Sequence, residues 1–430
     1  MVKDIVFVVF GGTGDLMRRK LAPAISKLSE KNLIGKDSIL IGVSRKKLSN
    51  EEYKEYINSG ASGLNSLKVI YESGDASKAD GLDNLMERLK NFKDKEKIFY
   101  LATSFKLFPS ILGRLKKEGF DDNSKIVFEK PFGNDLKSSD LLNDDIKAYF
   151  PEEKTFRIDH YLAKETVLNL TTLKFSNPVI HDLMNNNYVD KIEIIAHEDL
   201  GVKDRIEYYN DSGAIKDMIQ SHLLQILALL LAEKQGNIHE EKRNILSDIN
   251  IMDSPLNIIG QYKSYADELR AKEIPHSKTE TFAQIALECK NSTWGGVPLI
   301  VSTGKKLKSK YGQIKISFKS EKGIPSNMLI VDIYPKQDIA MILNSRMPGS
   351  DMFKPVRLEF CRECEFGPNS PDEYSVLLNE IIKGENLLFP KYEEVRESWR
   401  IVEDIESLRK GMNLVIYDDG SNLADIISRD

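Results

Sequence analysis

Residues 4–16 have the sequence DIVFVVFGGTGDL. The run 4–10 is apolar and β-branched, which is typical of a buried strand, and it leads directly into a glycine-rich turn followed by a helical pattern. Gly12 and Gly14 would permit a tight turn and a close approach of the backbone to a pyrophosphate, which would then lie at the helix N-terminus. The segment therefore predicts the first strand, turn and helix of a dinucleotide-binding fold, with Met17 in place of the usual third glycine.

The second strand pattern, residues 38–43, ends in a basic turn, Ser44-Arg45-Lys46-Lys47. A domain that binds NAD usually carries an Asp or Glu at this point, where the carboxylate holds the ribose hydroxyls. The reversed charge favours NADP, because the forked donors of Arg45, beside Ser44, suit a 2'-phosphate that a carboxylate would repel. The alternative is a basic turn that only faces water.

Alternating strand and helix patterns continue to residue 149 and indicate a doubly wound parallel sheet. From residue 188 onward, strand patterns follow one another through turns and longer excursions, which indicates antiparallel pairing. The sequence therefore predicts an α/β, Rossmann-like domain over residues 1–154, then an α+β domain over residues 155–430 with a large, mainly antiparallel sheet covered by helices. The expected strands are 67–71, 97–102, 125–129, 191–196, 282–289, 299–302, 313–318, 328–333, 339–343 and 356–360, and the expected helices are 80–92, 107–117, 136–149, 213–234, 372–383 and 393–410.

The charge balance excludes some classes of partner. With 61 basic and 66 acidic residues the net charge is -5, which argues against a protein of nucleic acids or membrane surfaces. The N-terminus leads directly into a strand pattern, and the longest apolar run, residues 226–232, is too short to span a bilayer. We therefore expect a cytoplasmic protein with no nucleic-acid or membrane partner.

The chain has three cysteines, and an odd number does not make a disulfide framework. Cys361 and Cys364 have a Cys-x-x-Cys spacing that is found in zinc and redox sites. Zinc would need two more ligands, and Cys289 stands without a nearby histidine in the sequence. We therefore expect no metal site.

Residues 157–165, RIDHYLAKE, place an acid, an imidazole, a phenol and an ammonium group within one short segment. If a helix begins at Asp159, His160 and Lys164 share one face and could hold an anion such as a phosphate. The alternative is a solvated helix start in which Asp159 is the N-cap and Lys164 pairs with a nearby acid.

His222 falls within the apolar stripe of the helix expected at 213–234. A single histidine in such a stripe is more often a core residue with its hydrogen bonds satisfied than a functional group. Asp217 and Ser221 are four residues apart and would share the neighbouring face.

Four segments, in this order along the chain, resemble the motifs of the glucose-6-phosphate dehydrogenase family. Residues 11–21 are similar to the N-terminal signature, 128–133 to the Glu-Lys-Pro-Phe-Gly element, 157–165 to the active-site signature, and 217–222 to the Asp-Met-x-Gln-Asn-His segment. Ala163 and Ser221 replace the usual Gly and Asn of these motifs. Weaker similarity continues towards the C-terminus, so the resemblance covers nearly the whole chain.

The resemblance implies an NADP-dependent oxidation of D-glucose 6-phosphate at C1 to the 6-phosphogluconolactone, the first step of the oxidative pentose phosphate pathway, by a homodimer or homotetramer. His222 matches the general base, Asp159 the carboxylate that orients it, and Lys20 a lysine near the reacting centre. The implied substrate-binding residues are Lys130, His160, Tyr161, Lys164, Glu198, Asp217, Lys305 and Lys310. The implied cofactor-binding residues are Gly11, Gly12, Thr13, Gly14, Asp15, Leu16, Ser44, Arg45 and Lys130. The family also implies a cis peptide bond between Lys130 and Pro131.

Two other functions remain open at this stage. Tyr334 stands where the family often has a Gln that contacts the sugar, and together with Ser221 and the loop at Thr103 it permits a dehydrogenase of the same fold acting on another hexose phosphate or a free sugar. A sensor that binds NADPH without catalysis is the second alternative. The presence of His222 and Asp159 speaks against that sensor, which would need neither.

Overall fold

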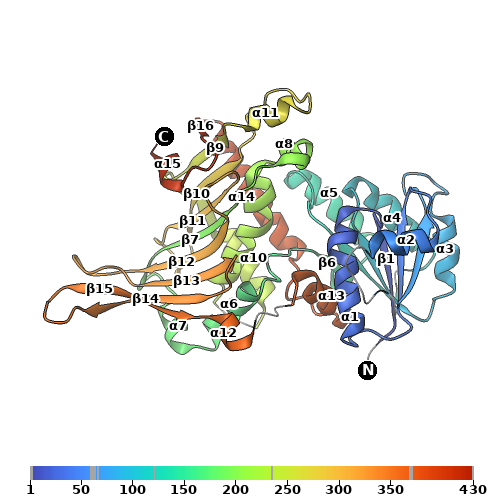
Figure 1. Cartoon of the computed structure of the whole chain (residues 1–430), viewed down its shortest axis with the longest axis horizontal. Helices are drawn as coiled ribbons and strands as arrows, with labels where there is room; N and C mark the ends of the chain where they lie inside the picture. The colour runs from blue at the N-terminus through green and yellow to red at the C-terminus, as the bar shows by residue number, and fades with distance from the viewer. Residues whose placement is uncertain are drawn as a thin grey trace. The chain divides into compact units, whose positions relative to one another are not determined.

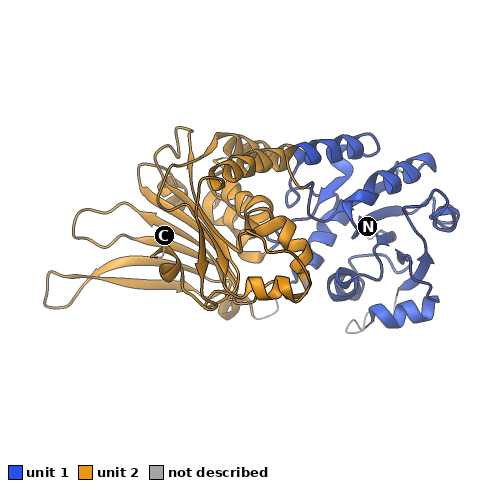
Figure 2. Cartoon of the chain, turned by 90° about the horizontal axis from the view of Figure 1, so that it is seen from above, with its two compact units in different colours: residues 1–133, 137–163, 371–392 blue, residues 134–136, 164–370, 393–430 orange. Residues whose placement is uncertain are grey.

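The computed structural model describes residues 3–58, 64, 67–120, 122–233, 236–367 and 371–428 (Figure 1). The chain forms two compact units, shown in blue and orange in Figure 2. Unit 1 contains Met1–Gly133, Lys137–Ala163 and Pro371–Tyr392, and unit 2 contains Asn134–Leu136, Lys164–Ser370 and Glu393–Asp430. Lys234, the last residue of the helix expected at 213–234, lies outside the described residues.

The described part of unit 1 contains a six-stranded sheet in the order β3-β2-β1-β4-β5-β6, in which every pair is parallel. This confirms the predicted doubly wound parallel sheet. The strands are β1 (Ile5–Phe10), β2 (Ile39–Ser44), β3 (Lys68–Ser73), β4 (Glu96–Leu101), β5 (Ser124–Phe128) and β6 (Thr155–Arg157). The sequence pattern does not reveal β6, because three residues are too few to show a period.

Helices cover the unit 1 sheet through apolar faces. They are η1 (Met17–Leu21), α1 (Ala22–Glu30), α2 (Asn50–Ile57), α3 (Asp83–Lys90), α4 (Phe108–Lys117), α5 (Leu136–Lys147) and α13 (Glu373–Lys383), with short 3-10 turns η3 (Phe105–Leu107) and η4 (Glu152–Lys154). The helix expected at 372–383 thus packs in unit 1, where Leu377 and Ile381 join the core around Ile25. The two domains predicted from sequence are continuous, whereas compact unit 1 also includes Pro371–Tyr392 from the C-terminal part of the chain. The functional roles of the two domains stay predictions.

The described part of unit 2 is built on a ten-stranded sheet in the order β15-β14-β13-β12-β7-β11-β10-β9-β16, with β8 paired to β10 (Figure 1). Most pairs are antiparallel, as predicted, but β7 with β11 and β9 with β16 are parallel. The strands are β7 (Val189–His197), β8 (Ile249–Ile251), β9 (Ile258–Tyr262), β10 (Phe282–Cys289), β11 (Leu299–Gly304), β12 (Tyr311–Phe318), β13 (Met328–Tyr334), β14 (Ile339–Arg346), β15 (Phe353–Phe360) and β16 (Leu414–Tyr417).

The main helices of unit 2 gather on one face of its sheet (Figure 1). The helices are α6 (Glu165–Phe175), α7 (Pro178–Leu183), η5 (Lys203–Arg205), α8 (Ile206–Ala214), η6 (Ile215–Leu223), α9 (Leu224–Leu231), α10 (Ile238–Asp248), α11 (Tyr265–Arg270), α12 (Arg362–Phe366), α14 (Tyr392–Arg409) and α15 (Leu423–Ile427). Among the described residues, the helical stretch Ile206–Leu231 is long and apolar enough to cross a membrane by length and composition alone. Its most apolar window is 83% buried inside the structure, which is the pattern of a core helix.

Cys361 and Cys364 form a disulfide, and Cys289 is a buried free thiol. The odd number of cysteines predicts no disulfide framework, and the chain has this one local bridge instead. The described residues contain no group of three or more His, Cys, Asp or Glu side chains that could hold a metal ion.

A buried ionic cluster joins α10 to α14 in unit 2. The Glu394 carboxylate is 0% exposed and lies 2.6 Å from the Lys242 Nζ and 2.7 Å from the His239 Nδ1. Burial would raise the pKa of Glu394, but the charges of Lys242 and His239 outweigh burial and hold it below its usual value. Removing one partner from such a cluster leaves an uncompensated buried charge.

We expect Lys242→Met to lower the free energy of unfolding by about 3–5 kcal/mol at pH 7, measured by urea denaturation. Because the pKa of Glu394 is lowered in the folded chain, the stabilisation is present above the ordinary carboxyl value of 4.5 and is lost as the pH falls below it. The difference in the free energy of unfolding between the wild-type chain and Lys242→Met should therefore become smaller in acid. Arg243→Met is the matched control, because this exposed neighbour lies on the same helix. Equal losses for both variants would contradict the role of the cluster.

Candidate active site

The glycine-rich turn of unit 1 follows β1 closely. The Gly11 and Gly12 N–H groups donate to the Val43 carbonyl at 2.9 and 3.0 Å, so the turn is tied to the end of β2. Gly11 has a φ of +89°, and a Cβ there would lie 2.1 Å from the Ala102 carbonyl oxygen. The expectation that Gly12 and Gly14 make the tight turn is therefore incomplete, because the left-handed conformation belongs to Gly11.

Met17 is fully buried in the core of unit 1 rather than at the surface of the turn. It begins η1, a π-helical turn that α1 continues, and Asp15 pairs with Arg19 at 2.7 Å just before it. The bulky side chain at the place of the usual third glycine is thus accommodated by the core. Gly14 is exposed at the start of this helix, as a backbone that approaches a pyrophosphate requires.

Side chains at the end of β2 form a hydrogen-bonded network beside the turn. The Ser44 hydroxyl lies 2.9 Å from the Thr13 hydroxyl and 2.8 Å from the Tyr71 hydroxyl. Arg45 is exposed and lines a pocket of about 330 Å³ with Lys78 and the backbone at Gly74. The donor set of glycine turn, hydroxyls and guanidinium fits a dinucleotide that carries a 2'-phosphate.

A partly buried carboxylate lies where β5 ends. The Glu129 carboxylate accepts hydrogen bonds from the Tyr100 hydroxyl at 2.5 Å and the Tyr374 hydroxyl at 3.2 Å. Burial raises the pKa of Glu129, and the two phenols and the charge of Lys130 offset only part of this effect. The peptide bond between Lys130 and Pro131 is cis, which confirms the prediction from the resemblance.

Tyr374, from α13, connects several of the predicted residues of unit 1. The Lys20 Nζ lies 6.0 Å from the centre of its ring, and its hydroxyl donates to Glu129, the neighbour of Lys130. Burial and then the negative charges of Glu129 and Asp159, among others, raise the pKa of Tyr374. Neither Glu129 nor Tyr374 is evident as a functional residue from the sequence, because their contact joins segments 245 residues apart.

The segment 159–164 is a turn, and α6 begins only at Glu165, so the condition that a helix begins at Asp159 is not met. The Asp159 carboxylate is buried and accepts a hydrogen bond from the Tyr161 N–H at 2.9 Å, a local bond that competes with helix formation. His160 packs edge-on against Tyr161, with ring centroids 5.0 Å apart. The argument that His160 and Lys164 share a helical face therefore fails.

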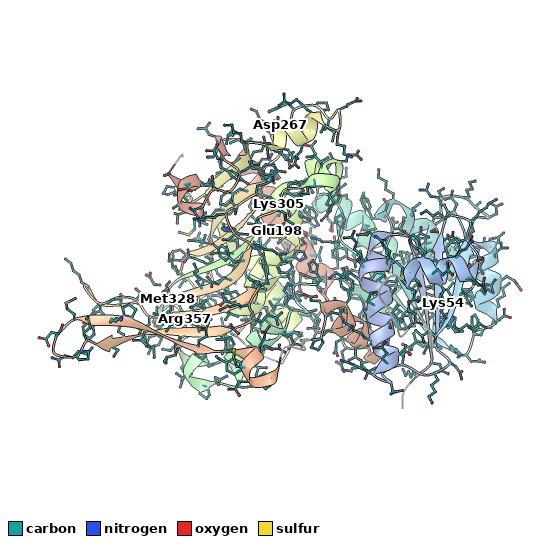
Figure 3. The ribbon with its side chains drawn as sticks, viewed as in Figure 1. Lys54, Glu198, Asp267, Lys305, Met328 and Arg357 are labelled. Atoms are coloured by element: carbon teal, nitrogen blue, oxygen red, sulfur yellow. A yellow bond between two sulfur atoms is a disulfide. The ribbon has the colours of Figure 1, made fainter. Side chains whose placement is uncertain are left out.

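In unit 2, Glu198 and Lys305 leave two neighbouring strands at the same edge of the sheet. The parallel pair β7 and β11 aligns His197 with Gly304, so the next residue of each strand emerges beside the other. The Lys305 ammonium forms an ion pair with the Glu198 carboxylate, and Figure 3 shows the two side chains together. The Lys305 Nζ also lies 5.5 Å from the centre of the Tyr209 ring.

His197, the neighbour of Glu198 in the chain, is unsuited to proton transfer near neutral pH. The His197 Nε2 lies 2.9 Å from the Ser302 hydroxyl, inside the sheet. Burial first, and then the charge of Lys315, lower the pKa of His197 to about 4, so its ring stays neutral. This histidine is a structural residue.

Glu280 and Gly213 fix the start of η6, the π-helix that carries Asp217 and His222. The Glu280 carboxylate accepts from the Ile215 N–H at 3.1 Å, and its carbonyl accepts from the Ala214 N–H at 3.0 Å. Gly213 has a φ of +65°, and a Cβ there would lie 2.2 Å from the Glu280 carboxylate. Burial raises the pKa of Glu280 to about 6, although the guanidinium of Arg409 lies 2.8 Å away.

Asp217 and His222 are both buried and lie five residues apart on η6. A π-helix has i to i+5 backbone hydrogen bonds, so these two residues lie about one helical turn apart on η6. The Ser221 hydroxyl donates to the Asp217 carbonyl at 2.7 Å, so this replacement of the family's Asn is absorbed by the helix backbone. After burial, the charge of Asp217 contributes to raising the pKa of Tyr208 to about 12.

Two lysines lie against one tyrosine ring in unit 2. The Lys164 Nζ is 5.5 Å and the Lys310 Nζ is 5.9 Å from the centre of the Tyr334 ring. Two ammonium groups beside one ring make a site of positive charge that suits a phosphate. Lys164 precedes α6 and Lys310 precedes β12, so the contact joins two separate elements.

The chain matches two family models. The model described as "Glucose-6-phosphate dehydrogenase, NAD binding domain" matches residues 8–169. The model described as "Glucose-6-phosphate dehydrogenase, C-terminal domain" matches residues 171–426. Together they account for most of the chain.

Among individual proteins, the glucose-6-phosphate 1-dehydrogenase of Bacillus subtilis (strain 168) is 33% identical over 444 aligned residues, which cover 93% of this chain and 90% of that protein. A solved structure of glucose-6-phosphate dehydrogenase in complex with its substrate glucose-6-phosphate matches with a TM-score of 0.91 and 28% identity, covering 99% of this chain and 97% of the other. The crystal structure of glucose-6-phosphate 1-dehydrogenase from Mycobacterium avium matches with a TM-score of 0.86 and 26% identity, covering 98% and 95%. The chain therefore belongs to the glucose-6-phosphate dehydrogenase family.

Proposed function

We propose that the chain oxidises D-glucose 6-phosphate at C1 to 6-phospho-D-glucono-1,5-lactone with NADP, as the first step of the oxidative pentose phosphate pathway. The observation that carries this proposal is the pair Asp217 and His222, a buried carboxylate and a buried imidazole on a π-helix whose start Glu280 fixes. Such a pair can bind a sugar hydroxyl and accept its proton. A protein that only binds the cofactor would need neither group.

His222 is proposed as the general base that takes the proton from the C1 hydroxyl. An imidazole suits this step because its ordinary pKa lies near neutral pH. Bound in the site, NADP would supply the acceptor for the hydride that leaves C1. From the sequence resemblance, we propose that Asp159 orients His222 and stabilises its charged form, and that Lys20 acts near the reacting centre.

The sugar phosphate is proposed to bind through positively charged and hydroxyl groups. Lys164 and Lys310 supply two ammonium groups at Tyr334, and His160, Tyr161 and Lys130 are assigned to the same ligand by the resemblance. Glu198 and Asp217 are proposed to accept hydrogen bonds from sugar hydroxyls, with Lys305 holding Glu198 in place. A wrong epimer would leave a buried carboxylate unpaired, which is costly.

The cofactor is proposed to lie on the glycine-rich turn formed by Gly11, Gly12, Thr13 and Gly14, with Asp15 and Leu16 at the helix start. Ser44 and Arg45 are proposed to hold the 2'-phosphate, because Arg45 is exposed beside a pocket at the ends of β2 and β3. A guanidinium at this place favours NADP over NAD. Lys130, at the end of β5, is assigned to both ligands.

A second candidate function is oxidation of another hexose phosphate. Tyr334 motivates it, because its ring contacts both proposed phosphate-binding lysines at a position where the family often has Gln. A ring at this position could change which sugar hydroxyls find partners.

We also propose that the chain acts in the cytoplasm as a homodimer or homotetramer. All eight residues of β15 are exposed, and β15 is the outermost strand of the unit 2 sheet. Its apolar side chains Phe353, Val356, Leu358 and Phe360 are exposed together with an unpaired strand edge. Exposed edges of this kind favour pairing with another chain.

The activity is tested by following NADPH absorbance with glucose 6-phosphate, mannose 6-phosphate and free glucose in parallel. We expect rapid reduction with glucose 6-phosphate, and for His222→Ala a fall in kcat of about 10²–10⁴-fold with substrate binding retained. His181→Ala, an exposed histidine, is the control. Reduction only with another sugar would favour the second candidate, and near-normal turnover of His222→Ala would remove His222 as the base.

Arg45→Ala should raise the KM for NADP by about 10- to 100-fold, because it removes a charged hydrogen bond to the 2'-phosphate. The KM for NAD, which lacks that phosphate, should change little. Lys47→Ala provides a control for the loss of one exposed positive charge in the same turn. Equal losses for NADP and NAD would contradict the assignment of Arg45.

Leu358→Lys should shift the chain towards the monomer in light scattering coupled to gel filtration, because it places a charge on the exposed strand β15. Leu33→Lys, an exposed leucine in unit 1, is the matched control and should leave the mass unchanged. A wild-type chain that is monomeric at micromolar concentration would overturn the proposal of a homo-oligomer.

A further inference from the structure

The disulfide between Cys361 and Cys364 lies at an exposed place outside the proposed site residues. It joins the end of β15 to the short helix α12, and the Cys361 sulfur accepts a hydrogen bond from the Cys364 N–H at 3.3 Å. Cys364 is exposed and Cys361 is partly buried, so a reagent in solution can approach the bridge. The remaining cysteine, Cys289, is buried in β10.

Arg362, between the two cysteines, connects this bridge to the start of α6. Its N–H donates to the Asp338 carboxylate at 3.2 Å, and its Nη2 lies 3.3 Å from the Glu165 Oε2. The Arg362 and Glu165 side chains are only 17% and 26% exposed, so their ion pair is partly shielded from water. The pair lines one pocket of about 290 Å³ together with Phe360 and Phe366.

Glu165 directly follows Lys164, one of the two lysines that lie against Tyr334. Lys164 has extended backbone angles of -69° and 133° as the residue that precedes α6. Glu165 is the first residue of α6. A movement of the Glu165 side chain, such as loss of its ion pair with Arg362, therefore occurs next to Lys164, whose ammonium group is proposed to bind phosphate. The disulfide is thus linked to Lys164 in three steps within unit 2: Arg362 lies between the two cysteines, it pairs with Glu165, and Glu165 follows Lys164 in the chain.

The bridge holds a helix that has little stability of its own. The helix α12 has five residues, and none of them is buried. A single helical turn is far below the length of about 12–15 residues at which an isolated helix becomes marginally stable. Its position, and with it that of Arg362, therefore depends on contacts around it, which include the disulfide, the contacts of Arg362 with Asp338 and Glu165, and the ring contact of Phe366 with Phe360 at 6.1 Å between centroids.

We propose that Cys361 and Cys364 are a thiol–disulfide exchange site for a dithiol protein or small dithiol, and that the state of this site sets the affinity for the sugar phosphate. In the cytoplasm, where the chain is proposed to act, thiol reductants keep stable disulfides rare, and those present are usually transient or redox-sensing. An exposed disulfide that closes a single helical turn is suited to such transient or redox-sensing behaviour. This inference rests on the proposed function for its effect on the sugar phosphate, but not for the exchange itself.

The exchange balances in atoms and electrons. A thiolate of the dithiol attacks the exposed Cys364 sulfur, a mixed disulfide forms, and Cys361 leaves as a thiolate that takes up a proton. The second thiol of the dithiol then attacks the mixed disulfide, and Cys364 leaves as a thiol. The chain gains two electrons and two protons, and the dithiol becomes a disulfide. An oxidised dithiol partner reverses the reaction.

Reduction of the Cys361–Cys364 disulfide removes the covalent bond that holds α12, and this weakens the ion pair between Arg362 and Glu165. Losing a partly exposed ion pair corresponds to a change of roughly twofold to fivefold in an equilibrium constant. The KM for glucose 6-phosphate should therefore rise by about that factor in the reduced chain. The KM for NADP should not follow, because the proposed cofactor residues belong to unit 1.

The experiment compares the full-length chain after treatment with dithiothreitol and after treatment with oxidised dithiothreitol. The reaction of a thiol reagent with the native chain should increase by two thiols on reduction, because Cys289 is buried. The KM values for glucose 6-phosphate and for NADP are then measured in both states, and the Kd of glucose 6-phosphate is measured by calorimetry.

Three variants make the result specific. The Cys361→Ser, Cys364→Ser double variant should have the KM of the reduced chain in both treatments, and Cys289→Ser should keep the wild-type response. Arg362→Gln should have a raised KM for glucose 6-phosphate even when the bridge is intact, which separates the contact with Glu165 from the sulfur chemistry itself.

Two outcomes would overturn the inference: no change in the number of reactive thiols between the treatments, or a change in thiols with the same Kd and KM for glucose 6-phosphate. A chain that shows no turnover in either state, yet exchanges its two thiols and changes its Kd for glucose 6-phosphate, would refute the proposed reaction and support the exchange site.

Discussion

The parallel pairing of neighbouring strands is the constraint on which both groups of candidate residues depend. In unit 1 it brings the glycine-rich turn after β1, Ser44 at the end of β2 and Glu129 after β5 to the same edge of one sheet. In unit 2 most strand pairs are antiparallel, but β7 and β11 are parallel. That exception makes Glu198 and Lys305 leave the sheet side by side, where an antiparallel pair would have sent them to opposite edges.

Three carboxylates that are wholly or partly shielded from water show different balances of burial and partners. Glu129 has two phenols as partners and keeps a raised pKa, whereas Lys242 and His239 lower the pKa of Glu394. Glu280 accepts a backbone hydrogen bond and pairs with Arg409, yet burial still raises its pKa. A carboxylate bonded to the backbone or to an adjoining phenol is suited to fixing a turn, while a carboxylate paired with a buried lysine is suited to joining two helices.

The sequence predicts the sheets and most helices because their signal is local: a period of two or of 3.6 residues and glycine at a turn. It fails where a single side chain competes with the period, as Asp159 does by bonding to the Tyr161 N–H and delaying α6 to Glu165. It also fails where the partner is distant in sequence. Nothing near Glu280 indicates that it fixes the start of η6, and nothing near Tyr374 indicates its bond to Glu129. The functional roles of the predicted site residues stay proposals, because they rest on family resemblance rather than on a local pattern.

The residues that depart from the family's motifs show how the motifs tolerate change. Met17 and Ala163, which stand where the motifs usually have glycine, both belong to the core of unit 1. Their larger side chains are packed there against apolar neighbours. Ser221 satisfies its hydroxyl on the Asp217 carbonyl of its own helix. Tyr334 is different, because its ring meets Lys164 and Lys310, two residues that we propose bind the sugar phosphate. A substitution absorbed by the core or the backbone leaves the chemistry of a site unchanged, whereas one that contacts two charged ligand-binding groups can alter the choice of substrate. Tyr334 is therefore the departure through which this chain can differ in specificity from its relatives.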